Sequence, residues 1–358
     1  MDKPLSVGII GPLPPPSGGM ANQTLQLAKL LRKENLQVDI VQTNAAYKPA
    51  WIGKIVMVRA LFRLFFYIIN LWQVAGRVDV FHIMANSGWS WHLFTMPAVW
   101  IAKIRGTATI VNYRGGKAEK FFNQSYAFVK PTLNACTKIV VPSRFLQEVF
   151  AKRNLDTQII ANIIDLDRFN PEKTTINCHA PHLLVARNLE PIYNNAMAIH
   201  VLDEIKKTHS QARLTIAGSG PELAKLQALV SKLGLSDSVS FTGRVDTQKM
   251  PALYQSADVM LNTSRVDNMP NSILESLASG VPVVSTDVGG IPYMVEHEMN
   301  VLLVKSEDIL SMADSVRRIL EDHALQEHLV SSGKTLVSKF SWHQVKSHWI
   351  KAYEEACH

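Results

Sequence analysis

Short apolar runs rich in β-branched residues alternate with amphipathic, helix-like segments along the whole chain. In the first half the runs are SVGIIG, QVDIVQT, DVFHIM, ATIVNY, KIVVPS and TQIIAN, and in the second half HLLVAR, RLTIAGS, SVSFTG, DVMLNT, VPVVST and NVLLV. Strands that alternate with helices in this way form parallel sheets whose two faces are both covered. The sequence therefore predicts two doubly wound α/β domains.

The length of the chain and one polar segment predict the domain boundaries. A chain of 358 residues can fill two domains of ordinary size. The segment NPEKTTINCHAPH, residues 170–182, is polar and aperiodic and contains two prolines, which is typical of a linker. We therefore expect an N-terminal domain over residues 1–169 and a C-terminal domain over residues 183–340. Ligands of such sheets bind beyond the carboxyl ends of the strands, so functional residues are expected there.

Charge is spread unevenly between the two halves. Residues 1–170 hold 20 basic against 9 acidic side chains, or +11, whereas residues 171–358 hold 17 against 21, or −4. This asymmetry indicates an anionic partner for the first half, such as a phosphorylated lipid, a membrane surface or nucleic acid. A solvated basic face without a partner would explain it too. No nucleic-acid recognition motif accompanies the charge, so nucleic acid is not expected.

Cysteine usage and hydropathy predict a cytoplasmic setting. Cys136, Cys178 and Cys357 lie far apart without metal-ligand spacing, which is typical of a reduced chain. We see no signal-peptide pattern at the N-terminus and no run of the roughly 20 uncharged apolar residues that a spanning helix needs. Residues 55–76 are intensely apolar and aromatic, with Arg59 and Arg63 one turn apart. They predict either a buried crossover helix or a face that rests on a membrane.

Several strand ends carry residues suited to a nucleotide. Gly18 and Gly19 close the loop after the first strand, just before a helix whose N-terminus could receive an anion. Arg187 ends HLLVAR, where a guanidinium suits a diphosphate. Gly218 ends RLTIAG and would permit close ligand approach, and Gly243–Val245, including Arg244, could offer backbone groups to a base. Plain turns and, for Arg187, a surface ion pair are the alternatives.

The stretch RVDNMPNSILESLASGVPVVSTDVGG, residues 265–290, holds two carboxylates around the start of a predicted helix. The helix occupies NSILESLASG, with Pro270 near its first turn and Gly280 as its C-terminal stop. Backbone amides at Asn271 and Ser272 would face phosphate oxygens. Glu275 could accept hydrogen bonds from a ribose, and Asp267 could reach hydroxyls of an attached sugar. Alternatively, both carboxylates only interact favourably with the helix N-terminus.

These motifs together resemble the retaining glycosyltransferases of family 4. The resemblance is carried by Arg187, GSGPE, FTGRV, the carboxylate-x7-Glu element from Asp267 to Glu275, SGVPVVSTDVGGIP and NIIDLDRF, with weaker support from Gly18-Gly19 and VVPSRFLQEVF. It implies the GT-B fold, in which two Rossmann-like domains face each other across a cleft. The last 18 residues, 341–358, resemble the helix that crosses back onto the N-terminal domain in this family.

The resemblance also implies roles for individual residues. Arg187 would bind the donor diphosphate, Glu275 would hold the ribose and Asp267 would orient the transferred sugar. Gly243–Val245 would cradle the base, and Gly18-Gly19 would lie against the sugar-phosphate junction. The implied donor-binding set is Gly18, Gly19, Arg187, Gly218, Gly243, Arg244, Val245, Asp267, Asn268, Met269, Pro270, Asn271, Ser272 and Glu275.

The sequence departs from the family pattern at three places. The family usually has Glu where Asp267 stands, and it has a Lys about six residues after the Arg, where this chain has Ile192, Tyr193 and Asn194. Where the family often has His-Gly, Arg114 follows the fourth strand; it could replace the missing positive charge or contact an anionic acceptor. His82 is a second acceptor-side candidate, although a buried core histidine explains it as well.

We therefore expect a retaining glycosyltransferase that uses a nucleotide-diphosphate sugar, foremost a UDP-sugar, and needs no metal or further cofactor. The Asp-x-Asp at Asp165 and Asp167 falls inside a turn element and is not interpreted as a metal site. The acceptor would be a hydroxyl of a lipid-linked or polysaccharide chain, as in lipopolysaccharide synthesis, at the inner face of the cytoplasmic membrane. A nucleotide-sugar 2-epimerase and a degenerate nucleotide-sugar-binding subunit are the alternatives.

Overall fold

The computed structural model describes residues 5–15, 18–45, 56–170 and 176–358, without the side chains of residues 56–61. The chain divides into two compact units, one formed by residues 1–163 and 345–358 and the other by residues 164–344. The division lies a few residues before the expected linker at 170–182, of which residues 171–175 lie outside the described part.

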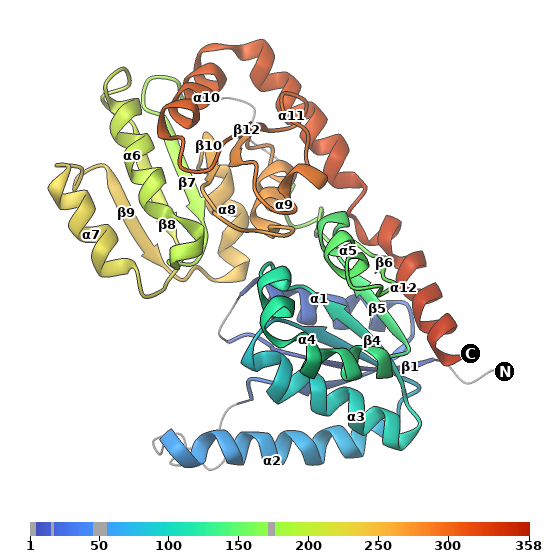
Figure 1. The fold of residues 1–358 in the computed structure, drawn as a ribbon. Coiled ribbons are helices and arrows are strands. Elements are labelled where there is room, and N and C mark those ends of the chain that lie inside the picture. Colours follow the sequence, from blue (N-terminus) through green and yellow to red (C-terminus); the bar gives the residue numbers. More distant parts are fainter. Residues whose placement is uncertain (1–4, 16–17, 46–55, 171–175) are drawn as a thin grey trace. The chain divides into compact units, whose positions relative to one another are not determined.

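A parallel sheet with the order β2-β1-β3-β4-β5-β6 forms the centre of the first unit (Figure 1). Its strands coincide with the apolar runs of the first half: β1 (Ser6–Gly11), β2 (Gln37–Gln42), β3 (Val80–Ala85), β4 (Ala108–Tyr113), β5 (Lys138–Val141) and β6 (Gln158–Ile159). The segments that join them contain α1 (Gly19–Lys33), α2 (Val56–Ala75), α3 (Met96–Arg105), α4 (Ala118–Ala135) and α5 (Arg144–Ala151), with a short π-helix at Trp91–Thr95.

Both faces of this sheet are covered. Along β3, Phe81 and Ile83 point into a core shared with α2 and α3, whereas His82 points to the opposite face. There α12 (Trp342–Cys357) packs, with Trp349 and Tyr353 against the imidazole. Residues 345–358, which include most of this helix, thus belong to the first unit although they are far from it in sequence.

The second unit repeats the scheme with the sheet order β12-β11-β10-β7-β8-β9. Its strands are again the predicted runs: β7 (His182–Ala186), β8 (Arg213–Ala217), β9 (Val239–Gly243), β10 (Val259–Asn262), β11 (Val283–Thr286) and β12 (Leu302–Val304). The helices are α6 (Asn195–Lys206), α7 (Leu223–Lys232), α8 (Met250–Gln255), α9 (Asn271–Ala278), α10 (Ile309–Glu321) and α11 (His323–Ser338), with short 3₁₀ turns at Pro191–Tyr193, Thr247–Lys249 and Ile291–Tyr293. The predicted doubly wound α/β fold class is confirmed.

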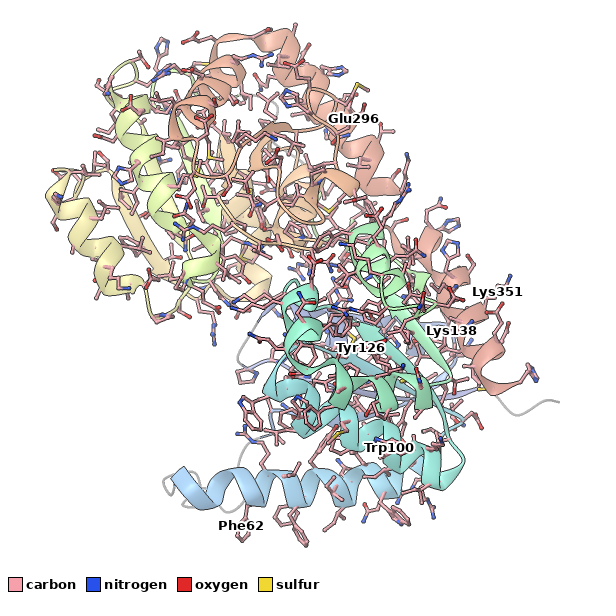
Figure 2. The ribbon with its side chains drawn as sticks, in the orientation of Figure 1. Phe62, Trp100, Tyr126, Lys138, Glu296 and Lys351 are labelled. Atoms are coloured by element: carbon pink, nitrogen blue, oxygen red, sulfur yellow. The ribbon has the colours of Figure 1, made fainter. Side chains whose placement is uncertain are left out.

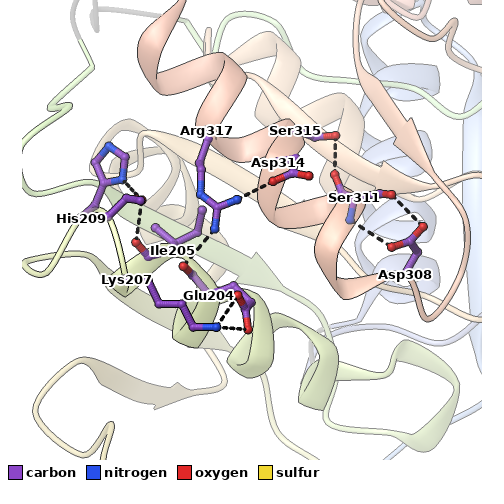
Figure 3. Close-up of polar contacts among 10 residues, drawn as sticks. Glu204, Ile205, Lys207, His209, Asp308, Ser311, Asp314, Ser315 and Arg317 are labelled. Atoms are coloured by element: carbon purple, nitrogen blue, oxygen red, sulfur yellow. Dashed lines mark hydrogen bonds and ion pairs between the residues drawn. The ribbon is translucent and has the colours of Figure 1, made fainter.

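Polar contacts supplement the apolar packing of α10 against α6 (Figure 3). Arg317 of α10 donates to the carbonyl oxygen of Glu204 at 3.1 Å and also pairs with Asp314. At the start of α10, the Asp308 side chain accepts from the Ser311 amide at 3.0 Å, which satisfies one of the donors that a helix N-terminus leaves open.

The helix α2 is apolar on two sides. Tyr67, Leu71 and Val74 are buried against the first unit, whereas Phe65 and Phe66 of the same helix are exposed. The buried side of α2 fits the interpretation as a crossover helix. That interpretation does not explain why the other side exposes aromatic residues. Among the residues that the structure describes, no helix is both long enough and apolar enough to cross a bilayer.

Candidate active site

Residues of the candidate site directly follow, or lie close behind, the ends of three neighbouring strands of the second unit. In the sheet, β10 lies beside β7 and β7 lies beside β8, all parallel. Arg187 directly follows β7, Gly218 directly follows β8, and Ser264 lies two residues after β10. Since parallel strands end at the same edge of a sheet, these residues share one edge.

An ion pair connects two of the predicted site residues. The Arg187 guanidinium pairs with the Asp267 carboxylate, and only 14% and 13% of the two side chains are exposed. Ser264 lies between them, because its hydroxyl donates to Asp267 at 3.1 Å and lies 3.5 Å from the guanidinium. Asp267 also accepts from the amide of Asn268 at 3.0 Å. The Asp267 carboxylate is thus held next to the cation that was expected to bind phosphate.

An aromatic ring supports the same guanidinium from one side. The Arg187 guanidinium carbon lies 4.3 Å from the centre of the Tyr193 ring, which is within cation–π range. The loop that carries Tyr193 is fixed by the next strand end, since Thr263 donates to the carbonyl oxygen of Tyr193 at 2.8 Å. At the position where the family has a Lys as a second cation, this chain has Tyr193, whose ring orients the Arg187 guanidinium.

Two glycines allow the loop after β8 to lie against Arg187. A Cβ on Gly218 would be 2.0 Å from the Arg187 carbonyl oxygen, and one on Gly220 would be 2.3 Å from the Leu189 carbonyl oxygen. Such distances exclude any side chain at these positions. The GSG sequence therefore serves the packing of one backbone on another, which also holds Arg187 in place.

The Gly-Gly pair after β11 does the same for Asp267. Gly289 has φ +57°, and its Cβ would lie 2.0 Å from the Asp267 carbonyl oxygen. The amide of Gly290 donates to that oxygen at 3.0 Å, and a Cβ on Gly290 would lie 2.1 Å from the Asn268 carbonyl oxygen. Backbone contacts with Gly289 and Gly290 thus hold the loop that carries Asp267.

The second predicted carboxylate lies inside α9, which begins at Asn271 as expected. Pro270 directly precedes the helix, and Gly280, with φ +71°, follows its C-terminal cap. Glu275 accepts a hydrogen bond from the buried Tyr254 hydroxyl at 2.9 Å. Burial raises the pKa of Glu275 to about 7, although Tyr254, Arg168 and Arg187 act to lower it. Glu275 thus lies in the electrostatic field of Arg187.

Two buried donors at this edge have no hydrogen-bond partner among the described residues. They are Nε of Arg187 and the hydroxyl of Ser272 in the first turn of α9. Amides in a first helical turn also have no carbonyl partner within their own helix, and the helix dipole favours negative charge there. The edge therefore has unused capacity for the oxygens of an anion.

The remaining donor-site candidates of this unit lie at the end of β9, the edge strand next to β8. Gly243 has φ +65° and open space around its Cβ position, and Arg244 is exposed. The structure places Gly243–Val245 along the same row of strand ends as Gly218. Among the described residues, no hydrogen bond or ion pair joins them to Arg187 or Asp267.

His82 belongs to the first unit and lies in its interior. Its side chain is fully buried, with Nδ1 2.8 Å from the Tyr353 hydroxyl and Nε2 3.1 Å from the Asn112 side-chain nitrogen. Burial and the nearby Arg114 charge lower its pKa to about 3. Both ring nitrogens are used inside the unit, so the structure favours the core-histidine interpretation over contact with an acceptor.

Arg114 directly follows β4 and is half-buried in the first unit. Its guanidinium donates to the Asn162 side-chain oxygen at 2.5 Å, and burial lowers its pKa to about 10. The group therefore keeps its positive charge near neutral pH.

In the same unit Gly18 precedes α1, with nothing within 4 Å of its Cβ position, and Gly19 is the first residue of that helix.

The Asp-x-Asp sequence lies in a turn. Asp165 accepts from the amide of Arg168 at 3.2 Å, and its carbonyl oxygen accepts from Phe169. In the described part of the chain, no group of three or more His, Cys, Asp or Glu side chains is arranged to hold a metal.

Two family descriptions match consecutive parts of the chain. Residues 17–168 match Glycosyltransferase Family 4, and residues 167–336 match Glycosyl transferases group 1. The chain belongs to the family 4 glycosyltransferases.

Curated relatives of this family 4 chain include an uncharacterised glycosyltransferase of Methanocaldococcus jannaschii, 34% identical over 44% of this chain and 40% of the relative. Another is the GDP-mannose-dependent alpha-(1-6)-phosphatidylinositol monomannoside mannosyltransferase of Mycobacterium tuberculosis, 30% identical over 49% of each protein. The chain thus spans about half the length of the curated relatives that it matches.

Solved structures of similar fold cover nearly the whole chain. HepE of Anabaena, in complex with UDP and glucose, has a TM-score of 0.73 at 16% identity over 97% of this chain and 99% of HepE. Sucrose-phosphate synthase of Thermosynechococcus elongatus has a TM-score of 0.73 at 18% identity over 98% of each chain. This likeness supports the GT-B fold class that the sequence analysis expected.

Sequence reasoning about this family 4 glycosyltransferase missed three residues of the site. Ser264 could have been found, since it stands directly after an apolar run that ends in a site loop. Tyr193 was noted only as a replacement for the family's Lys, and its stacking on Arg187 depends on the fold. Tyr254 left no local signal, because its partner Glu275 lies 21 residues away on another helix.

Proposed function

We propose that the chain is a retaining, metal-independent glycosyltransferase that takes its sugar from a nucleotide-diphosphate sugar. The observation that supports this most is the placement of Arg187, Asp267 and the first turns of α9 at the ends of neighbouring strands. A cation, a helix N-terminus and two carboxylates within one strand-end edge suit a molecule with phosphates in its middle and hydroxyls at both ends.

In this proposal the donor lies along the strand-end edge. Arg187 and the first turn of α9 with Ser272 bind the diphosphate, and Glu275 accepts hydrogen bonds from the ribose. Asp267, preceded in the same loop by Ser264, faces the hydroxyls of the transferred sugar, while Asn268, Met269 and Pro270 form the loop between. Gly218 and Gly243–Val245 border the side on which the base would bind. The structures of HepE with UDP, with UDP and glucose and with UDP-glucose support UDP as the nucleotide.

In the proposed reaction, Arg187 and the amides of α9 stabilise the leaving group. As the bond between the anomeric carbon and the phosphate oxygen breaks, negative charge grows on the diphosphate next to Arg187 and the α9 amides, which act without reorganisation. The acceptor hydroxyl forms the new glycosidic bond on the same face of the sugar, and its proton passes to the leaving phosphate. Asp267 orients the sugar and does not act as the nucleophile, since in this proposal it lies beside the sugar hydroxyls.

The acceptor in this proposal is a hydroxyl of a lipid-linked or polysaccharide chain, and the protein acts in the cytoplasm at the inner face of the membrane. The mycobacterial relative is named for a phosphatidylinositol mannoside, which supports a lipid-linked acceptor. Arg114 is retained as the acceptor-side cation, and Gly18-Gly19 as the part of the first unit that meets the donor. The name of that relative also specifies GDP-mannose, so UDP and GDP sugars must be compared directly.

Thermal-shift measurements with UDP, GDP and their sugars identify the donor, since a ligand that binds only the folded protein raises its Tm. Release of UDP or GDP from the best donor is then followed with extracted membrane lipids as acceptor. We expect Glu275→Ala to abolish release while the circular dichroism spectrum is unchanged. Undiminished turnover in that variant contradicts the proposal.

The same assay separates the alternatives. An epimerase would convert the donor sugar when no acceptor is present, whereas a transferase requires the lipid extract. A regulatory subunit would bind UDP tightly and give no transfer to any acceptor. Membership of family 4 favours transfer over both.

A further inference from the structure

The outward side of α2 exposes five large apolar side chains in a row: Phe62, Phe65, Phe66, Ile69 and Trp72. We call these residues the aromatic face. Their spacing of three and four residues places them along one side of the helix. Phe65 and Phe66 are 62% and 53% exposed, and Figure 2 shows Phe62 pointing away from the sheet of its unit. Monomers of this size seldom expose such a continuous aromatic stripe without a partner.

The aromatic face is separate from the packing of the helix. The opposite side of α2 buries Tyr67, Leu71 and Val74 in the core of the first unit, next to α3. The Tyr67 hydroxyl fixes the helix further by donating to the Phe94 carbonyl oxygen at 2.8 Å. Within the part of the chain that the structure describes, packing buries one apolar side of α2 and leaves the aromatic face exposed.

Cations border this face, and acidic side chains are absent from the two helices. The Arg105 guanidinium carbon lies 5.0 Å from the Trp72 ring centre, and the Lys103 ammonium lies 5.4 Å from the Trp100 ring centre. Neither α2 nor α3 contains Asp or Glu. The acidic residue nearest in sequence, Asp79, is bound to the amide and hydroxyl of Ser6. Cations paired with Trp rings at the edge of an apolar stripe match the headgroup level of an anionic bilayer.

We propose that the aromatic face is a docking surface for an anionic lipid bilayer, in which α2 lies in the plane of the interface. The aromatic rings enter the acyl boundary, and Arg105 and Lys103 bind lipid phosphates. This deepens the membrane association contained in the proposed function, because it names the surface and the lipid charge.

A second copy of the chain fits the face less well than a bilayer does. A symmetric contact through α2 would bring Arg105 and Lys103 of both copies to one interface, with no carboxylate on α2 or α3 to compensate. An anionic surface attracts the same charges, so charge complementarity selects the bilayer.

The test is co-sedimentation of the full chain with vesicles of phosphatidylcholine alone or with added phosphatidylglycerol. We expect binding that increases with the anionic lipid, weakens with salt and falls about tenfold or more in Phe65→Glu/Phe66→Glu. The matched control is Leu310→Glu/Met299→Glu, which adds the same two charges at apolar residues of the other unit that are 64% and 45% exposed and is expected to bind as wild type does.

Two further measurements keep the outcome unambiguous. The rise in Tm with UDP is expected to be equal in wild type and the double variant, since the aromatic face contains no donor-site residue and Arg187, Asp267 and Glu275 lie in the other unit. Loss of that response in the wild type would count against the proposed function and not against the docking surface. No binding to anionic vesicles at low salt, or unchanged binding of the double variant, would overturn the docking surface. So would a concentration-dependent dimer that the same double variant abolishes.

Discussion

Arg187 and Asp267 form an ion pair that joins the loops after β7 and β10. The carboxylate thus occupies the cation that the proposed function assigns to the diphosphate. In the proposed function, phosphate oxygens of a nucleotide sugar replace this carboxylate, and Asp267 turns toward the sugar. The pair therefore makes the two halves of donor recognition depend on each other.

This dependence predicts an unusual response to Asp267→Asn. Removal of the carboxylate leaves the Arg187 charge without its partner, so we expect a lower Tm in the absence of ligand. UDP binding is expected to tighten by about tenfold, or about 1.4 kcal/mol, because no carboxylate competes for the guanidinium. Titration calorimetry with UDP measures the change, and Asp267→Glu serves as the charge-preserving control. Weaker UDP binding in Asp267→Asn would contradict the proposed competition.

The Tyr193 ring should matter for affinity through Arg187 alone. Tyr193→Phe keeps a ring beneath the guanidinium, whereas Tyr193→Leu removes the cation–π contact of about 1 kcal/mol. We expect Tyr193→Phe to bind UDP nearly as wild type does and Tyr193→Leu to bind it about fivefold more weakly. Equal affinities of the two variants, measured by the same titration, would show that the ring does not orient Arg187.

Stability should depend on pH through Glu275. Its pKa is raised from 4.5 to about 7 by burial, so between these values the folded protein holds a proton that the unfolded chain releases. The free energy of unfolding therefore falls as pH rises through this window, at about 1.4 kcal/mol per unit at most. Glu275→Gln keeps an oxygen for the Tyr254 hydroxyl but cannot ionise. We expect the advantage of this variant over wild type to grow from pH 5 to pH 8, up to about 3 kcal/mol, in urea unfolding. If the difference in the free energy of unfolding between the two proteins were constant with pH, ionisation of Glu275 would not be the cause.

The effect on stability of the close contact between Gly289 and Asp267 can be separated from the effect of the backbone conformation of Gly289. Gly289→Ala is strained by φ +57° and would also place a Cβ 2.0 Å from the Asp267 carbonyl oxygen. Gly234 has φ +69° with nothing within 4 Å, so Gly234→Ala is strained only by its conformation. We expect about 1 kcal/mol of destabilisation for Gly234→Ala and about 3 kcal/mol or more for Gly289→Ala in urea unfolding. Equal losses would mean that the loop yields to the extra methyl group.

Much of the fold was predictable because its strands are local signals. Each apolar run, from SVGIIG to NVLLV, coincides with a strand, and a parallel sheet fixes at which edge the following residues lie. Arg187, Asp267 and Glu275 could be assigned to one edge for that reason. Their pairing could not, since the bond from Tyr254 to Glu275 and the ring beneath Arg187 depend on how separate loops pack.

The two-sided helix α2 shows a further limit. Sequence letters revealed that residues 55–76 were apolar, but not that Tyr67 and Leu71 would be buried while Phe65 and Phe66 remain exposed. Crossover helix and membrane face were treated as alternatives. The structure assigns the first role to one side of the helix and leaves the other side open to the second.

The packing of Tyr353 against His82 links residues that are 271 positions apart. A ribosome adds about 5 to 20 residues each second, so strand β3 waits on the order of tens of seconds for the helix that covers it. During this interval the imidazole face of the nascent sheet has neither Trp349 nor Tyr353. The first unit is thus begun first and completed last during synthesis, and chaperones that recognise exposed apolar surface would meet it in that state.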